Sequence, residues 1–96
     1  APARRRGKGG RAPRAIVEVR MKGFVEYVVK ALVERPDEVG VTQREAPGGA
    51  LLEINCDRCD MGKVIGRGGR TIKAMRALLD AAAARSNLRV ELEIID

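Results

Sequence analysis

The chain has 96 residues, a length that suits one small domain. Its only aromatic residues are Phe24 and Tyr27, which argues against RRM-type and OB-type binders, because these stack bases on several rings. No run of residues is apolar for long enough to span a membrane, and the basic start lacks the apolar segment of a signal peptide. We therefore expect a cytoplasmic protein with no membrane contact.

The net charge of +6 is unevenly placed along the chain. Residues 1–20 hold seven bases and one acid, whereas residues 21–96 hold twelve bases and twelve acids. The high isoelectric point, about 10.0, therefore comes from the N-terminal segment. Within residues 21–96 the bases gather around a glycine-rich turn, and a neutral domain with one basic face indicates a directed phosphate site.

Residues 1–14 are rich in Arg, Gly, Pro and Ala without an apolar period, which predicts a disordered basic segment. We divide the chain into a flexible arm, residues 1–20, and a domain, residues 21–96. The arm is either a cloning remnant or upstream extension, or a segment with non-specific RNA affinity through counterion release. Residues 15–19 are more apolar and either extend the first helix or add an edge strand.

The first clear helix is expected over residues 21–35. Its apolar stripe consists of Phe24, Val25, Val28, Ala31 and Leu32. Pro36 should end the helix, because the residue before a proline avoids the helical region. A strand over residues 39–45 and a hairpin connection at residues 46–49 follow.

A second strand with one buried face is indicated by alternation of apolar and polar residues. Its apolar members are Leu52, Ile54 and Cys56. Asp57 follows this strand and suits the N-cap of a short helix. That helix and the next are separated by a tight glycine turn, with apolar residues at helical spacing on both sides. These are Met61, Val64 and Ile65 before the turn, and Ile72, Met75 and Leu79 after it.

The helix after the turn should run from about residue 70 to residue 85, and residues 88–95 alternate as a last strand. The element order is therefore helix, strand, strand, helix, helix, strand. It predicts an α+β domain in which three helices cover one face of a three-stranded sheet.

The turn Gly66-Arg67-Gly68-Gly69 has the chemistry of a site for a nucleic-acid backbone. Glycine allows positive φ and close approach of another backbone, and the start of a helix presents unpaired N–H groups that attract phosphate. We expect the N–H groups of Arg67, Gly68 and Gly69 to meet phosphates. The candidate RNA-binding residues are Lys63, Ile65, Gly66, Arg67, Gly68, Gly69, Arg70, Ile72, Lys73 and Arg76.

Two kinds of side chain complete this candidate site. Lys63, Arg67 and Arg70 would add charge, and bases would lie in an aliphatic groove between Ile65, Ile72, Met75 and the second strand. Several of these candidate residues can also be explained without RNA binding. Ile72 and Met75 are first of all core residues, and Lys73 or Arg76 also fits a solvated face.

The segment Val-Ile-Gly-Arg-Gly-Gly-Arg-Thr-Ile, residues 64–72, is similar to the Ile-Gly-x-x-Gly core of KH domains. In these domains the GXXG loop clamps the backbone of about four nucleotides. The element order resembles that of the bacterial, type II, KH fold. The phrases Val-Glu-Tyr-Val-Val-Lys-Ala-Leu-Val, Asp-Met-Gly-Lys-Val-Ile-Gly and Gly-Arg-Thr-Ile-Lys-Ala extend the resemblance over residues 21–96, to the KhpA family of small bacterial single-KH-domain proteins.

The resemblance implies a cytoplasmic protein that binds single-stranded RNA and acts as an RNA chaperone. It further implies self-association and pairing with KhpB, also called Jag or EloR, with effects on cell-wall synthesis and cell elongation. A homodimer through the turn region also agrees with the small core of residues 21–96, and Val64, Ile65 and Ile72 would then lie close to the surface.

Two rival functions stay open. In one, the fold mainly builds a dimer or docks on KhpB, which the alanine-rich residues 81–84 would suit. In the other, a ribosome-associated factor uses the basic arm on structured rRNA.

Other chemistry is not expected. Cys56 and Cys59 form a CxxC, but the chain has no histidine and no further cysteine, and zinc takes four ligands. Two chains sharing a metal is the remaining metal alternative, while Cys56 fits the core. The turn matches neither a Walker loop nor a dinucleotide fingerprint. No nucleophile–base pair stands out, so we expect a protein without a cofactor that is not an enzyme.

Overall fold

The computed structural model describes residues 13–95. Within this range three α-helices and three strands follow one another, with short 3-10 turns between some of them. They are α1 (Arg14–Leu32), η1 (Pro36–Glu38), β1 (Gly40–Ala46), β2 (Gly49–Asn55), η2 (Arg58–Asp60), α2 (Met61–Ile65), η3 (Arg67–Gly69), α3 (Arg70–Ala84) and β3 (Arg89–Ile94). The order α-β-β-α-α-β confirms the predicted α+β class.

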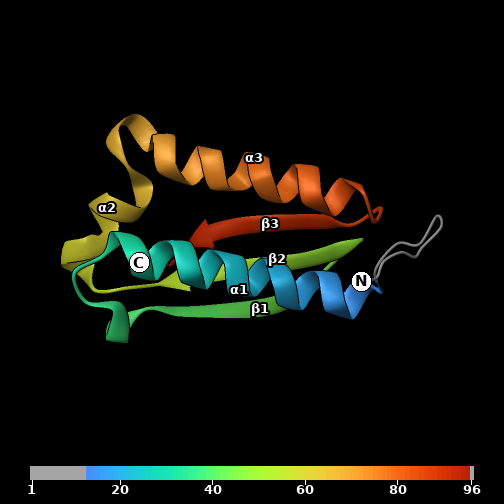
Figure 1. The fold of residues 1–96 in the computed structure, drawn as a ribbon, viewed down its shortest axis with the longest axis horizontal. Helices are drawn as coiled ribbons and strands as arrows, with labels where there is room; N and C mark the ends of the chain where they lie inside the picture. Colours follow the sequence, from blue (N-terminus) through green and yellow to red (C-terminus); the bar gives the residue numbers. More distant parts are fainter. Residues whose placement is uncertain (1–12, 96) are drawn as a thin grey trace, which may run out of the picture.

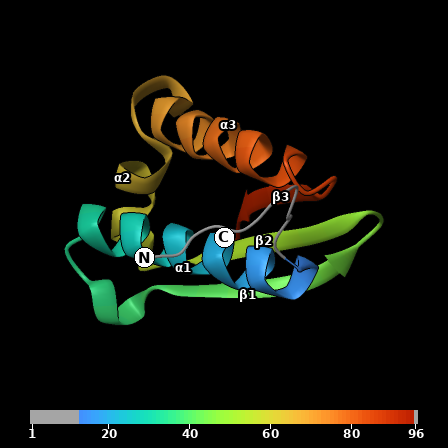
Figure 2. The same ribbon diagram turned by 45° about the vertical axis from the view of Figure 1, so that its right-hand side comes forward.

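The strands form one mixed sheet with the order β1-β2-β3. β1 and β2 are antiparallel around Pro47 and Gly48, whereas β2 and β3 are parallel. A parallel pair requires a crossover connection, and here α2, the glycine turn and α3 form that crossover. Figure 1 shows α1 and α3 along the same face of the sheet, with the connection from α2 to α3, drawn in gold, at one end of the molecule. The turned view in Figure 2 shows the same layering of helices on one face.

The first helix begins at Arg14 rather than Met21, and its start is part of the domain. Of the two alternatives for residues 15–19, the structure contains the helical extension. Val17 and Met21 are only 7% and 6% exposed and belong to the core. Residues 14–20 are therefore helical and not a flexible arm, while residues 1–12, which hold most of the predicted basic arm, lie outside the described residues.

Ion pairs around Arg14 explain the early start of α1. Its guanidinium donates from Nε to Glu18 Oε2 at 2.8 Å and from Nη2 to Glu45 Oε1 at 3.0 Å. It also donates to the carbonyl oxygen of Gly49 at 2.7 Å. Glu18 is 7% exposed and accepts a second hydrogen bond from Gln43 Nε2 at 2.9 Å. These contacts join the first turn of α1 to the β1–β2 hairpin.

The buried side of α1 differs from the predicted apolar stripe. Val25 is buried as expected and Val28 is half-buried, but Phe24 is 38% and Leu32 is 39% exposed. The stripe instead follows steps of four residues: Val17, Met21, Val25 and Val29. These residues meet Leu52 and Ile54 of β2, Val90 and Leu92 of β3, and Met75 and Leu79 of α3 in one core. No helix within residues 13–95 has the length and apolar character needed to cross a membrane.

Candidate nucleic-acid interface

A buried carboxylate positions α2 and the turn that follows it. Asp60 is 2% exposed and accepts hydrogen bonds from the backbone N–H groups of Glu34, at 3.2 Å, and Arg35, at 3.1 Å. Because burying an unpaired carboxylate is unfavourable, both partners must stay in place. The helix α1 therefore ends at Leu32, before the predicted end at residue 35, and the chain after it is fixed against the start of α2.

Asp57 forms the predicted N-cap, and its carboxylate accepts from the N–H of Cys59 at 2.8 Å. The cap stands at η2, which leads directly into α2. This backbone hydrogen bond, together with the Arg35 guanidinium at 3.1 Å, holds the pKa of Asp57 below its ordinary value. The same local contacts thus favour the charged form of the cap.

The two cysteines differ in burial, because Cys56 is half-buried whereas Cys59 is exposed. Cys56 is half-buried just beyond β2 and packs against the core. Burial, reinforced by the carboxylates of Asp60 and Asp57, raises the pKa of its thiol. Within residues 13–95 no group of three or more His, Cys, Asp or Glu residues is placed to hold a metal ion.

The glycine turn reverses the chain between α2 and α3 through backbone conformations that favour glycine. Gly66 has φ 80° and ψ 167°, a combination that is essentially restricted to glycine. A Cβ at Gly66 would lie 2.3 Å from Thr71 Oγ1. Gly68 and Gly69 are left-handed, with φ of 63° and 77°. The predicted turn between two helices is confirmed, with η3 occupying its centre.

Two backbone donors of the turn are available to a ligand. Within the described residues the N–H groups of Arg67 and Gly68 have no hydrogen-bond acceptor. Gly69 N–H, by contrast, already donates to the carbonyl of Gly66 at 3.0 Å within the turn. The helix α3 starts at Arg70 without a side-chain cap, which leaves the positive end of its dipole next to the turn.

Three cations surround these donors. Arg67, Arg70 and Lys73 are exposed, and none of them forms a salt bridge among residues 13–95. Lys63, also predicted to add charge, lies 3.6 Å from both Glu34 Oε2 and Asp60 Oδ1. Its charge is thus partly compensated within the protein.

Two of the three side chains predicted to line an aliphatic groove lie in the core. Ile65 is half-buried, but Ile72 is 6% and Met75 is 3% exposed, so both lie in the core. The second strand is the central strand of the sheet and is paired on both edges. Val64 is fully buried as well. Val64 and Ile72 therefore do not offer an apolar surface for a dimer, and Ile72→Glu would test folding rather than an interface.

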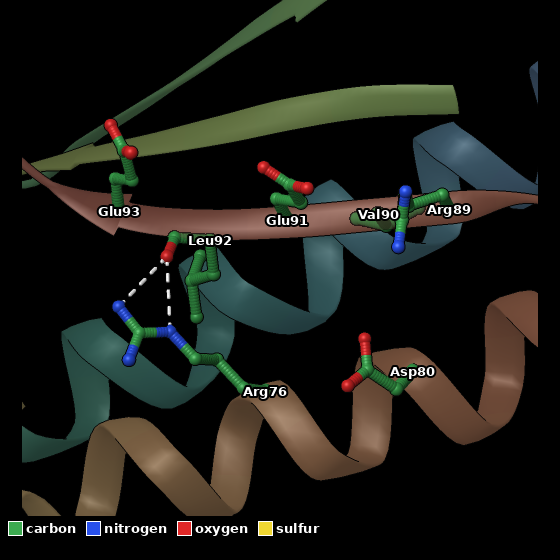
Figure 3. Close-up of a pocket in the computed structure, with 7 residues that line it drawn as sticks. All are labelled: Arg76, Asp80, Arg89, Val90, Glu91, Leu92 and Glu93. Atoms are coloured by element: carbon green, nitrogen blue, oxygen red, sulfur yellow. Dashed lines mark hydrogen bonds between the residues drawn. The ribbon is translucent and has the colours of Figure 1, made fainter. Parts of the chain in front are cut away.

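Arg76 lies beside β3 and not at the turn. Its guanidinium donates from Nε and Nη2 to the carbonyl oxygen of Leu92, both at 3.1 Å, and so covers part of the free edge of β3 (Figure 3). An open cleft of about 380 Å³ lies here between α3 and β3. Asp80, Glu91 and Glu93 also line it. The sequence alone gives no sign of this cleft, because the cleft depends on the parallel placement of β3 beside β2.

The open face of the sheet has a different charge from the helical layer. Alternation along the strands turns Glu53, Glu91 and Glu93 away from the helices, together with Arg44 and Arg89. Arg44 is already paired with Glu53 at 2.7 Å. The uncompensated bases at the turn therefore lie on the opposite side from this acidic face.

The sequence also matches a known family. A family model described as the KH domain of KhpA/KhpB matches residues 22–94. The chain belongs to the KhpA/KhpB KH-domain family. This confirms the family predicted from the glycine turn and its flanking residues, and the KH domain predicted from the element order.

Similar full-length proteins carry one name. The chain is 45% identical over 76 residues to "RNA-binding protein KhpA" of Chlamydia pneumoniae, covering 79% of this chain and 97% of the relative. Proteins of the same name from Borreliella burgdorferi and Halalkalibacterium halodurans are 46% and 45% identical over 73 and 76 residues. These matches cover 76% and 79% of this chain, and 89% and 100% of the relatives. The KhpA relatives are named for RNA binding and not for an enzymatic reaction, in agreement with the absence of catalysis expected above.

Proposed function

We propose that this KhpA/KhpB-family chain binds single-stranded RNA and holds its backbone at the turn between α2 and α3. The observation that carries the proposal is the pair of N–H donors of Arg67 and Gly68, which have no acceptor within residues 13–95. They stand at the uncapped start of α3, where a helix attracts phosphate. The name that the relatives carry, RNA-binding protein KhpA, supports the same ligand.

We expect the turn to hold the phosphates of the RNA and the neighbouring cleft to face its bases. Phosphates would accept from Arg67 and Gly68 and would be attracted by the side chains of Arg67, Arg70 and Lys73. Arg76 lies six residues into α3, about 9 Å along the helix axis from Arg70. Bases extending from the turn would therefore pass the cleft between α3 and β3. Its mixed charges suit the donors and acceptors of base edges better than a phosphate.

The double variant Arg67→Asp, Gly68→Asp tests this proposal. The left-handed Gly68 has no atom within 4 Å of an added Cβ, and aspartate tolerates this conformation better than most residues. The variant should therefore fold. Filter binding should show RNA affinity reduced by about tenfold or more, because two charge-assisted contacts become repulsive.

The far end of α3 offers a matched control. Arg85→Asp, Asn87→Asp changes the charge by the same amount, and Asn87 is also left-handed, with φ 56°. This control should bind RNA nearly as the unaltered protein does. Equal losses for both double variants would show a general charge effect and would overturn the proposed site, as would intact binding by the turn variant.

A second candidate function, a protein-interaction module, is favoured by the outer side of α3. Leu78 is 57% exposed there, and it lies among exposed alanines at positions 74, 77, 81 and 82. Such a surface allows close approach of another chain, either a second copy or a KhpB-type partner, with the cell-wall role that the family resemblance implies. Leu78→Glu should then lower the mass measured by light scattering for the protein alone or mixed with that partner, while RNA binding is unchanged. A mass that is monomeric from the start, with no complex in the mixture, would exclude this function.

A further inference from the structure

The outward side of α1 has features that neither the core nor the glycine turn explains. Tyr27 is 75% exposed, although aromatic residues make up only 2% of the chain. The buried residues of α1 lie along the opposite side of the helix. Arg20 stands two helical turns before Tyr27 and Lys30 one turn after it, so that the three share one side.

This side carries positive charge that is not compensated in the described structure. Arg20 and Lys30 are exposed, and neither forms a salt bridge among residues 13–95. The acid of the first turns, Glu18, is buried and paired with Arg14. In the sequence, five further bases precede α1. They are Arg4, Arg5, Arg6, Lys8 and Arg11.

Gly23 lies one turn before Tyr27 in the middle of the helix. It has no positive φ, and a Cβ added there would meet no atom within 4 Å. Glycine inside a helix is destabilising relative to alanine, so neither conformation nor packing accounts for it. Helical side chains lean toward the N-terminus, so the turn that contains Gly23 is the one next to the Tyr27 side chain. Gly23 is exposed and adds no side chain there, so the surface beside Tyr27 stays open to a ligand.

We infer that Tyr27, with Arg20 and Lys30, forms a second contact for single-stranded RNA, distinct from the glycine turn. A base stacks on the ring of Tyr27, and the two cations meet the flanking phosphates. Stacking of this kind accepts any base, because every base has a π-face. The inference rests on the proposed function, since it takes RNA as the ligand.

The charges favour RNA over a protein partner at this side. Exposed apolar side chains also lie on the outward half of α1, namely Ile16, Val19 and Phe24. The ring of Tyr27 itself, however, stands between two cations and beside a glycine, which suits a stacked base with flanking phosphates. The position of Tyr27 on α1 also suits an RNA strand that is held at the glycine turn. Figure 1 shows the C-terminal end of α1 beside α2, at the end of the molecule that carries the turn, and α1 lies in the same layer as α3. RNA can thus pass from the turn to Tyr27 without crossing the acidic sheet face.

Tyrosine emission provides a direct test. Tyr27 is the one tyrosine of the chain, which has no tryptophan, so the emission of the protein reports this ring alone. Uridine oligonucleotides of about four nucleotides, the length that a KH turn clamps, and of about twelve nucleotides serve as probes. The longer probe should quench Tyr27 strongly and the shorter one weakly. Free tyrosine amide, titrated in parallel, corrects for light absorbed by the RNA.

Substitutions separate stacking from folding. Tyr27→Ala should weaken binding of the longer probe about fivefold or more, the range expected for one stacked base, and leave the shorter probe unaffected. Tyr27→Phe, which keeps the ring, should bind within about twofold of the unaltered protein. Gly23→Gln should raise the melting temperature and weaken binding of the longer probe, because it strengthens the helix and covers the ring.

The outcomes distinguish this inference from the proposed function. Unquenched emission at saturating long probe, or unchanged affinity of Tyr27→Ala, would overturn the Tyr27 contact. A change of mass in light scattering without a change of affinity would overturn it too and would identify a protein interface. If the Arg67→Asp, Gly68→Asp variant kept full affinity and quenching, the turn would fail as the site and Tyr27 would stand. If the unaltered protein bound neither probe, both the proposed turn site and the Tyr27 contact would be refuted.

Discussion

Replacing Gly66 by alanine should destabilise the domain far more than the same change at Gly68. The backbone of Gly66, at φ 80° and ψ 167°, would be strained by about 1–3 kcal/mol with a side chain present. Its Cβ would also lie 2.3 Å from Thr71 Oγ1 and 2.8 Å from the backbone nitrogen of Thr71. That nitrogen belongs to α3 and cannot move alone. We therefore expect a total loss of about 3 kcal/mol or more.

At Gly68 the expected loss is smaller. Its left-handed backbone, with φ 63° and ψ 18°, costs alanine about 1–2 kcal/mol, and no atom lies within 4 Å of the added Cβ. In a domain of this size 1 kcal/mol shifts the melting temperature by about 4–8 °C. Gly66→Ala should thus melt about 12 °C or more below the unaltered protein, and Gly68→Ala clearly nearer to it. Equal shifts, or an unshifted Gly66→Ala, would refute the geometry assigned to the turn.

Three further predictions concern the supports of the site. Asp60→Ala should lower the free energy of unfolding by about 2–4 kcal/mol in denaturant titrations, because it removes the buried carboxylate that accepts from the part-buried N–H groups of Glu34 and Arg35; a loss below about 1 kcal/mol would contradict this. The lowered pKa of Asp57 means that the stability from its charge is present above the ordinary value of 3.8 and is lost as the pH falls through the folded pKa. The difference in melting temperature between the unaltered protein and Asp57→Asn should therefore disappear only below about pH 3.8. A difference that disappears near neutral pH would contradict the lowered pKa of Asp57. Deleting residues 1–12, which hold five bases, should flatten the log–log salt dependence of RNA binding by about 0.7 per lost phosphate contact and keep the ranking among RNA sequences; a changed ranking would show that the segment reads bases.

Local patterns were sufficient for the elements whose neighbours in sequence determine them. The alternation around Val90 and Leu92 predicted β3 within a residue at each end, and the spacing of Ile72, Met75 and Leu79 predicted α3. The glycines of the turn were informative for the same reason, since a positive φ is a property of one residue. Fold class and the location of the turn followed from these signals, whereas the family followed from the resemblance of residues 64–72 and their flanking segments to KH domains.

Features that depend on distant partners could not be predicted in this way. Arg14 appeared as part of a basic arm because its acceptors on Glu45 and Gly49 lie more than thirty residues away. The end of α1 depends on Asp60, and the position of Arg76 depends on Leu92.

Whether the candidate groove residues are buried could not be predicted for a related reason. Periodicity marks Ile72 and Met75 as apolar but does not say whether another layer covers them. Only the strand order shows that β2 is central and that β1 and β3 are the edges, and only the packed core shows that the helices bury this side.

The most direct test of RNA binding at the turn is an amide NMR titration of the ¹⁵N-labelled protein with a uridine oligonucleotide of about four nucleotides. The amide signals of Arg67 and Gly68 should shift most, followed by those of Arg70 and Lys73, while Arg44 and Glu53 on the open sheet face, away from the cleft, stay in place. Shifts centred on the sheet face, or unmoved turn amides at concentrations where filter binding is saturated, would contradict the proposed function.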